Sequence, residues 1–75
     1  MQDPGFHTLM HKIGKTIRHR RQMAAMTQKE LAQRTHISQY YLGKIEQGVA
    51  NPSIERMSRI AQELTIALSD LLTAD

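Results

Sequence analysis

A chain of 75 residues without cysteine has room for one small domain, and it can have neither disulfide bonds nor a thiolate metal site. Its 40% hydrophobic content favours folding over disorder, while the lack of 18 consecutive apolar residues or a secretory segment excludes a membrane span and favours the cytoplasm. Residues 1–48 contain eight Lys or Arg and three Asp or Glu, whereas residues 49–75 contain two and four. The basic part can attract a polyanion such as nucleic acid, or it can serve solubility alone.

The first seven residues include adjacent Pro4 and Gly5 and are expected to form a flexible arm, either native or added during cloning. Met10 is a further candidate start. On this reading the folded domain spans residues 8–75.

A first helix is predicted from Thr8 to Met23. Leu9, Ile13 and Ile17 recur every four residues and form one apolar stripe. Arg21 falls close to this stripe, and a charge that is buried there needs a partner.

Two short helices joined by a tight turn are predicted between Thr27 and Gly48. Thr27 and Glu30 have the spacing of a capping box, so the first helix starts at Thr27 and ends near Thr35. Ser38 caps the second, which ends at Gly48, and Ile37 in the turn is expected to be buried. Such a pair forms a helix-turn-helix unit, whose second helix can enter the major groove of DNA.

The second helix of this unit has two faces. Tyr41, Leu42 and Ile45 are predicted to face the core, and the outward set is Gln39, Tyr40, Gly43, Lys44 and Gln47. Glutamine can pair with adenine and lysine with guanine. Gly43 either lets the backbone approach DNA closely or is merely tolerated there.

Two more helices are predicted after Gly48. The first is capped by Asn51 or by Ser53, and its core stripe is Ile54, Met57, Ile60, Ala61 and Leu64. The last carries Leu68, Leu71 and Leu72. These leucines either form a dimer interface or dock on the core.

The sequence resembles the phage-repressor and Cro helix-turn-helix family, also called the xenobiotic-response-element type. The resemblance covers about residues 13–72, and it rests on the residues at 26–32 (MTQKELA), 45–48 (IEQG), 51–53 (NPS) and 60–61 (IA), in order and at the family's spacing. It implies an all-α, compact five-helix bundle of the lambda-repressor type. The family consists of DNA-binding regulators, many of them repressors.

The resemblance also implies contacts with double-stranded DNA. Base contacts are expected from Gln39, Tyr40 and Lys44. Phosphate contacts are expected from Thr27, Gln28, Ser38, Gly43 and Gln47. If Tyr40 packs inward and Tyr41 points outward, this assignment shifts by one position.

Structural roles follow from the same resemblance. It pairs Arg21 with Glu46, which would give the arginine its partner. The family often has glycine, commonly at positive φ, where this chain has Ala25, His36 and Thr65. Ala67 replaces a capping serine, so the last helix and its part in a dimer are expected to be less well defined.

Three functions are considered. The first is a sequence-specific transcriptional regulator that reads a near-palindromic operator as a homodimer. The second is an antitoxin or a restriction-modification controller of the same fold, which also binds a toxin or an RNA polymerase subunit. The third is a protein–protein adaptor without DNA binding, which the basic charge counts against.

Neither an enzyme nor a cofactor is expected, because no nucleophile–base pair is evident. His7 and His11 have a spacing that can bind a metal, but no cysteine or nearby carboxylate completes a site. A polar surface is the preferred interpretation.

Overall fold

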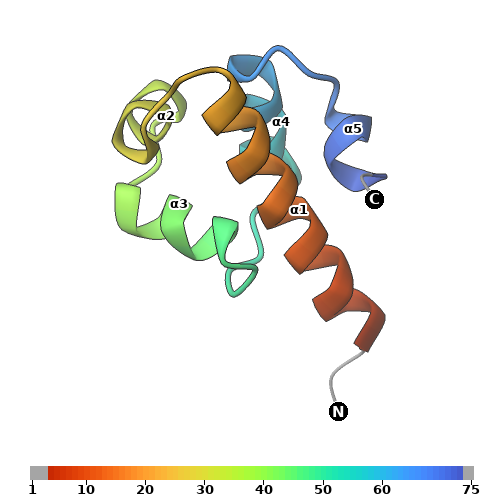
Figure 1. Ribbon diagram of the computed structural model, residues 1–75. Coiled ribbons are helices and arrows are strands. Elements are labelled where there is room, and N and C mark those ends of the chain that lie inside the picture. Colours follow the sequence, from red (N-terminus) through yellow and green to blue (C-terminus); the bar gives the residue numbers. More distant parts are fainter. Residues whose placement is uncertain (1–3, 74–75) are drawn as a thin grey trace.

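The computed structural model describes residues 4–73, which form helices connected by turns, without a strand (Figure 1). The helices are α1 (Pro4–Met23), α2 (Gln28–Thr35), α3 (Gln39–Glu46), α4 (Ile54–Glu63) and α5 (Leu68–Leu72). In the view of Figure 1, α2 and α3 lie on one side of α1 and α5 lies on the other, while α4 lies behind α1 and packs against α2 and α5. The predicted all-α, five-helix architecture is confirmed.

The first helix begins at Pro4, about one turn before the predicted start at Thr8. Proline suits a first helical position because it lacks only an N–H that would have no partner within the helix. Residues 4–7, expected in the flexible arm, are therefore helical, and residues 1–3 lie outside the described part of the chain.

The predicted stripe on α1 is wrong at Leu9, which is 37% exposed, whereas Met10 is buried. Steps of four residues rotate the stripe by about 40° each, because a helical turn has only 3.6 residues. Leu9 therefore drifts off the face of Ile13 and Ile17. The first turns of α1 also project beyond the other helices (Figure 1).

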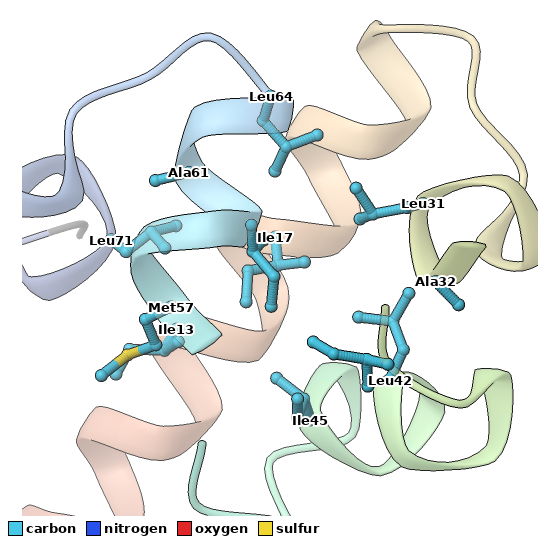
Figure 2. Packing of buried hydrophobic residues seen from close by; sticks show 12 residues of the cluster. Ile13, Ile17, Leu31, Ala32, Leu42, Ile45, Met57, Ala61, Leu64 and Leu71 are labelled. Carbon is cyan, nitrogen blue, oxygen red and sulfur yellow. The ribbon is translucent and has the colours of Figure 1, made fainter. Parts of the chain in front are cut away.

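The core takes apolar side chains from all five helices (Figure 2). Its largest fully buried members are Ile17, Leu31, Leu42, Ile45, Ile60 and Leu71. Burying an aliphatic side chain of this size stabilises a fold by roughly 1.5–3 kcal/mol. This core holds α3 against α1 and α2, so it determines where the outward face of α3 lies.

The helix-turn-helix unit has the predicted caps. Thr27 Oγ1 accepts from Glu30 N at 3.0 Å, and Thr27 N donates to Glu30 Oε1 at 3.4 Å. Ser38 Oγ accepts from Tyr41 N at 3.0 Å, and Ile37 is buried in the turn between the helices. Leu42 and Ile45 are buried as predicted, and Tyr41 is half-buried.

Ser53 caps α4, since its Oγ accepts from Arg56 N at 3.1 Å. This settles the choice between Asn51 and Ser53. The predicted core stripe holds for Met57, Ile60, Ala61 and Leu64 but is wrong for Ile54, which is 60% exposed. Ile54 is the first residue of α4 and lies at the edge of the bundle.

Left-handed backbone occurs at the three positions where the resemblance implied it. Ala25 and His36 have φ of 57°, and Thr65 has φ of 59°. Gly48, just beyond the C-cap of α3, also has positive φ. Helix α4 closes despite the β-branched Thr65, because Ile66 N donates to Ala61 O at 3.0 Å.

The leucines of α5 differ in exposure. Leu71 is fully buried, Leu68 is partly buried against the core, and Leu72 is 37% exposed. Leu71 therefore has no surface to offer a second subunit, which corrects its assignment to a dimer interface. Ala67 cannot accept a capping hydrogen bond, and only its N–H is capped, by Asp70 Oδ2 at 3.0 Å.

Helices α1 and α3 approach each other most closely at Gly14, whose importance the sequence did not indicate. A Cβ at this position would lie 2.5 Å from Ile45 O and 2.7 Å from Glu46 O. Both obstacles are backbone atoms at the end of α3, so they cannot move aside as a flexible side chain would. Gly14 thus allows α1 to pack directly on the C-terminal end of α3.

We predict that Gly14→Ala destabilises the protein by about 2–3 kcal/mol, because the methyl group forces α1 away from α3. Gly43→Ala is the matched control. A Cβ there meets only the Gln28 side chain at 3.5 Å, so this change should stabilise the helix by up to about 1 kcal/mol. Urea denaturation of both variants measures the difference. Equal stability of the two would contradict the close packing at Gly14.

Candidate nucleic-acid interface

The three side chains expected to contact bases lie on the side of α3 that faces away from the core. Tyr40 is 76% exposed, Gln39 is exposed, and Lys44 is half-buried. Tyr41 points inward instead, and its hydroxyl donates to Asn51 O at 3.4 Å. The orientation of the two tyrosines is thereby settled, and the assignment does not shift by one position.

Tyr40 and Lys44 contact each other on this face. The Lys44 ammonium lies 5.2 Å from the centroid of the Tyr40 ring, a cation–π distance. The residues are four positions apart on a helix, so their side chains are neighbours. The spacing in the sequence is the signal for this contact, which holds the lysine beside the exposed Tyr40 ring.

A shallow hollow of about 310 Å³ brings the outward face of α3 together with the start of α2. We call it the reading hollow; it is lined by Gln28, Gln39, Tyr40, Gly43, Lys44 and Gln47. Gly43 lines the hollow without a side chain, so the helix backbone itself borders the hollow at this position. All three residues expected to contact bases therefore border one surface.

Of the residues expected to contact phosphates, Gln28, Gly43 and Gln47 line this hollow, and Thr27 and Ser38 cap the two helices that form it. Thr27 and Ser38 are exposed at the N-termini of α2 and α3, where helix dipoles favour a negative charge. Both hydroxyl oxygens accept capping bonds, so each hydroxyl hydrogen can still be donated to an anion. Gln47 is exposed at the other end of α3.

The expected ion pair between Arg21 and Glu46 is present behind this surface. Arg21 Nε donates to Glu46 Oε2 at 2.8 Å and Nη2 donates to Oε1 at 3.0 Å, which makes the pair bidentate. The side chains are only 11% and 4% exposed. Arg21 Nη1 also donates to Met26 O at 2.9 Å, so the guanidinium is satisfied on both sides.

Gln28 extends this ion pair to the surface, which the sequence did not indicate. Its Nε2 donates to Glu46 Oε1 at 3.3 Å. One side chain at the start of α2 is thereby held by a carboxylate at the end of α3. This leaves a second amide hydrogen of Gln28 for an external acceptor.

The histidines of α1 form no metal site with other described residues. Between residues 4 and 73, no group of three or more His, Asp or Glu could hold a metal ion. His11 instead packs against Gly48, where its Cα would lie 3.0 Å from an added Cβ. Over the same range, no helix is both long and apolar enough to cross a bilayer.

Residues 17–71 match the helix-turn-helix family HTH_3. An uncharacterized HTH-type transcriptional regulator of Mycobacterium tuberculosis is 36% identical over 54 residues, which are 72% of this chain and 39% of that protein. The HTH-type transcriptional regulator SlrR of Bacillus subtilis is 34% identical over 64 residues, 84% of this chain and 42% of SlrR. The chain thus spans about two-fifths of the length of these curated relatives.

Solved structures show the same fold. The clp gene regulator ClgR of Corynebacterium glutamicum superposes with a TM-score of 0.82 at 28% identity, over 85% of this chain and 68% of that one. The restriction-modification controller protein C.AhdI of Aeromonas hydrophila has a TM-score of 0.79 at 27% identity, over 83% of this chain and 94% of that one. The SinR protein/SinI protein complex contains a chain with a TM-score of 0.79 at 28% identity, over 83% of this chain and 61% of that one.

The family match covers most of the chain, and the capped helix-turn-helix unit and five-helix bundle agree with it. The chain belongs to the Cro/C1-type helix-turn-helix family of DNA-binding transcription regulators.

Proposed function

We propose that the protein is a sequence-specific DNA-binding transcriptional regulator that places α3 in the major groove. The observation that carries this proposal is the shared orientation of Gln39, Tyr40 and Lys44 around the reading hollow, with Tyr40 76% exposed. An aromatic ring that is this exposed is not part of the core. It is well placed to contact a base pair.

Phosphate contacts would orient the protein, and base contacts would select the sequence. The helix N-termini at Thr27 and Ser38, together with Gln28 and Gln47, supply the donors for phosphates. Gln39 can pair with adenine and Lys44 can donate to guanine, while the Tyr40 ring can contact a thymine methyl group. The Gln28 bond to Glu46 supports this division, since it fixes one phosphate donor relative to α3.

We propose that the protein acts as a homodimer whose two α3 helices enter the major groove one helical turn apart, about 34 Å. On α5, Leu72 and the exposed part of Leu68 remain candidates for the interface. Leu71 is excluded by its burial. A palindromic operator would mirror the two-fold symmetry of such a dimer.

A second candidate function is that of a controller protein, which would bind a protein partner as well as DNA. The similarity to the controller protein C.AhdI supports it, because the superposition covers 94% of that chain. An RNA polymerase subunit or a toxin is the corresponding partner class. An adaptor without DNA binding is less well supported, since the outward face of α3 is polar and adjoins basic side chains.

Selection from random duplex DNA at about physiological salt tests the proposal. We expect enrichment of a near-palindromic sequence with half-sites ten to eleven base pairs apart. A single enriched half-site would retain base reading and remove the stable dimer. If no sequence is enriched and binding disappears as salt rises, the protein has only a generic basic surface.

We predict that Lys44→Ala weakens binding to the selected duplex by about 1–3 kcal/mol and relaxes preference at one base pair. The lysine is lost as a base-edge donor, while the phosphate contacts remain. Fluorescence anisotropy with duplexes changed at single positions measures this. A uniform loss on every duplex would instead assign Lys44 to the backbone. Lys29→Ala, an exposed lysine of α2, is the matched control.

We predict that Gly43→Ala weakens DNA binding although it does not destabilise the free protein. The added methyl group occupies the floor of the reading hollow, where only glycine leaves the helix backbone open to DNA. The affinity for the selected duplex and the melting temperature are measured for the wild type and for Gly43→Ala. Unchanged affinity would show that glycine is merely tolerated at this position.

A further inference from the structure

A second hollow of about 300 Å³ lies where α1 meets α3, and we call it the α1/α3 cleft. Its lining residues are Arg18, Arg21, Gln28, Gly43, Glu46 and Gln47. Three of them, Gln28, Gly43 and Gln47, also line the reading hollow, so the two surfaces adjoin. Arg18 and Arg21 are the lining residues from α1, and the sequence analysis assigned Arg18 to no site.

The charges in the cleft do not balance. Arg21 and Glu46 form a bidentate ion pair and neutralise each other. Gln28 is neutral and is bound to the same carboxylate. Arg18 is exposed and forms no ion pair with another described side chain, whereas Arg34 and Arg59 are each paired with a glutamate. The cleft therefore carries one uncompensated positive charge, on Arg18.

The packing at Gly14 explains why Arg18 reaches α3. Arg18 follows Gly14 by one helical turn and precedes Arg21 by three residues, so these three positions lie along one side of α1. Gly14 brings the α1 backbone onto the carbonyl end of α3. The carbonyl end of α3 carries a partial negative charge, which would repel a phosphate near Gln47. The positive charge of Arg18 offsets this repulsion.

We propose that the α1/α3 cleft binds one DNA phosphate and that Arg18 provides its positive charge. The cleft would hold the phosphate between the Arg18 guanidinium and the amides of Gln28 and Gln47, beside the base pairs read by α3. Guanidinium groups suit this role because they can donate two parallel hydrogen bonds to phosphate oxygens. This proposal rests on the proposed DNA-binding function and adds α1 to the interface.

The same helix provides a matched control in Arg20. Arg20 is exposed and is likewise without an ion pair among residues 4–73. It lines a different groove, between α1 and α5, together with Lys12, Lys15, Thr16, His19, Asp70 and Thr73. Arg18→Gln and Arg20→Gln remove the same charge two residues apart, but only the first changes the α1/α3 cleft.

The experiment measures binding of the wild type and of both variants to one selected duplex across a range of salt concentrations. We expect Arg18→Gln to weaken binding about tenfold and Arg20→Gln to change it less than twofold. A variant that makes one phosphate contact fewer releases fewer counterions from the DNA when it binds. The slope of log K against log[salt] should therefore become shallower by about 0.9 per bound subunit for Arg18→Gln. Arg18→Lys should restore most of this slope. Melting temperatures of all variants should match the wild type, because neither arginine is paired.

A second set of duplexes, altered at the base pairs read by α3, separates phosphate binding from base reading. The loss caused by Arg18→Gln should be the same factor on each duplex. Equal losses for Arg18→Gln and Arg20→Gln would overturn the proposal and leave DNA binding intact, since Arg18 would then contribute only to the general field. A loss that depends on sequence would also overturn it. If the wild type binds no duplex, the proposed function itself fails.

Discussion

The bidentate ion pair between Arg21 and Glu46 joins the end of α1 to the end of α3 out of contact with most solvent. Each partner is satisfied, since the arginine also binds Met26 O and the glutamate also accepts from Gln28. Removing one partner of such a pair leaves a buried charge, at a cost of about 3–5 kcal/mol. A chain of 75 residues has a small margin of stability, so this pair constrains the whole fold.

The ion pair acts together with Gly14 to set the position of α3. Gly14 allows the backbones of α1 and α3 to pack in direct contact, and the ion pair links the two helices through their side chains. Through Gln28, the same carboxylate holds the start of α2. Three helices are thus fixed relative to one another at the edge of the reading hollow, so Gln39, Tyr40 and Lys44 are presented from a rigid support.

The charged groups that support α3 and those that face outward differ in how they are paired. Arg21 and Glu46, which are buried behind α3, neutralise each other, whereas Lys44 on the outward side of α3 and Arg18 on α1 have no carboxylate partner among the described residues. A surface of this kind favours a polyanion in solution. Neither Tyr40 nor Lys44 belongs to the buried core that holds the bundle together.

The sequence by itself determined the features that depend on neighbouring residues in the chain. The caps at Thr27 and Ser38, the inward and outward faces of α3 and the turn at Ile37 follow from spacing and side-chain chemistry, whereas the choice of Ser53 over Asn51 as the cap of α4 came from the structure. The resemblance to a known family added the pair of Arg21 with Glu46 and the left-handed sites at Ala25, His36 and Thr65.

Only the tertiary structure decided the features that depend on how far neighbouring helices extend. Leu9 and Ile54 have the spacing of core residues but lie where no helix covers them, and Leu71 is buried because α1 and α4 pack over α5. The close approach at Gly14 and the cleft beside Arg18 arise where α1 meets α3, two helices that α2 separates along the chain. Helical periodicity gives the direction of a side chain, but only the packed bundle determines what that side chain meets.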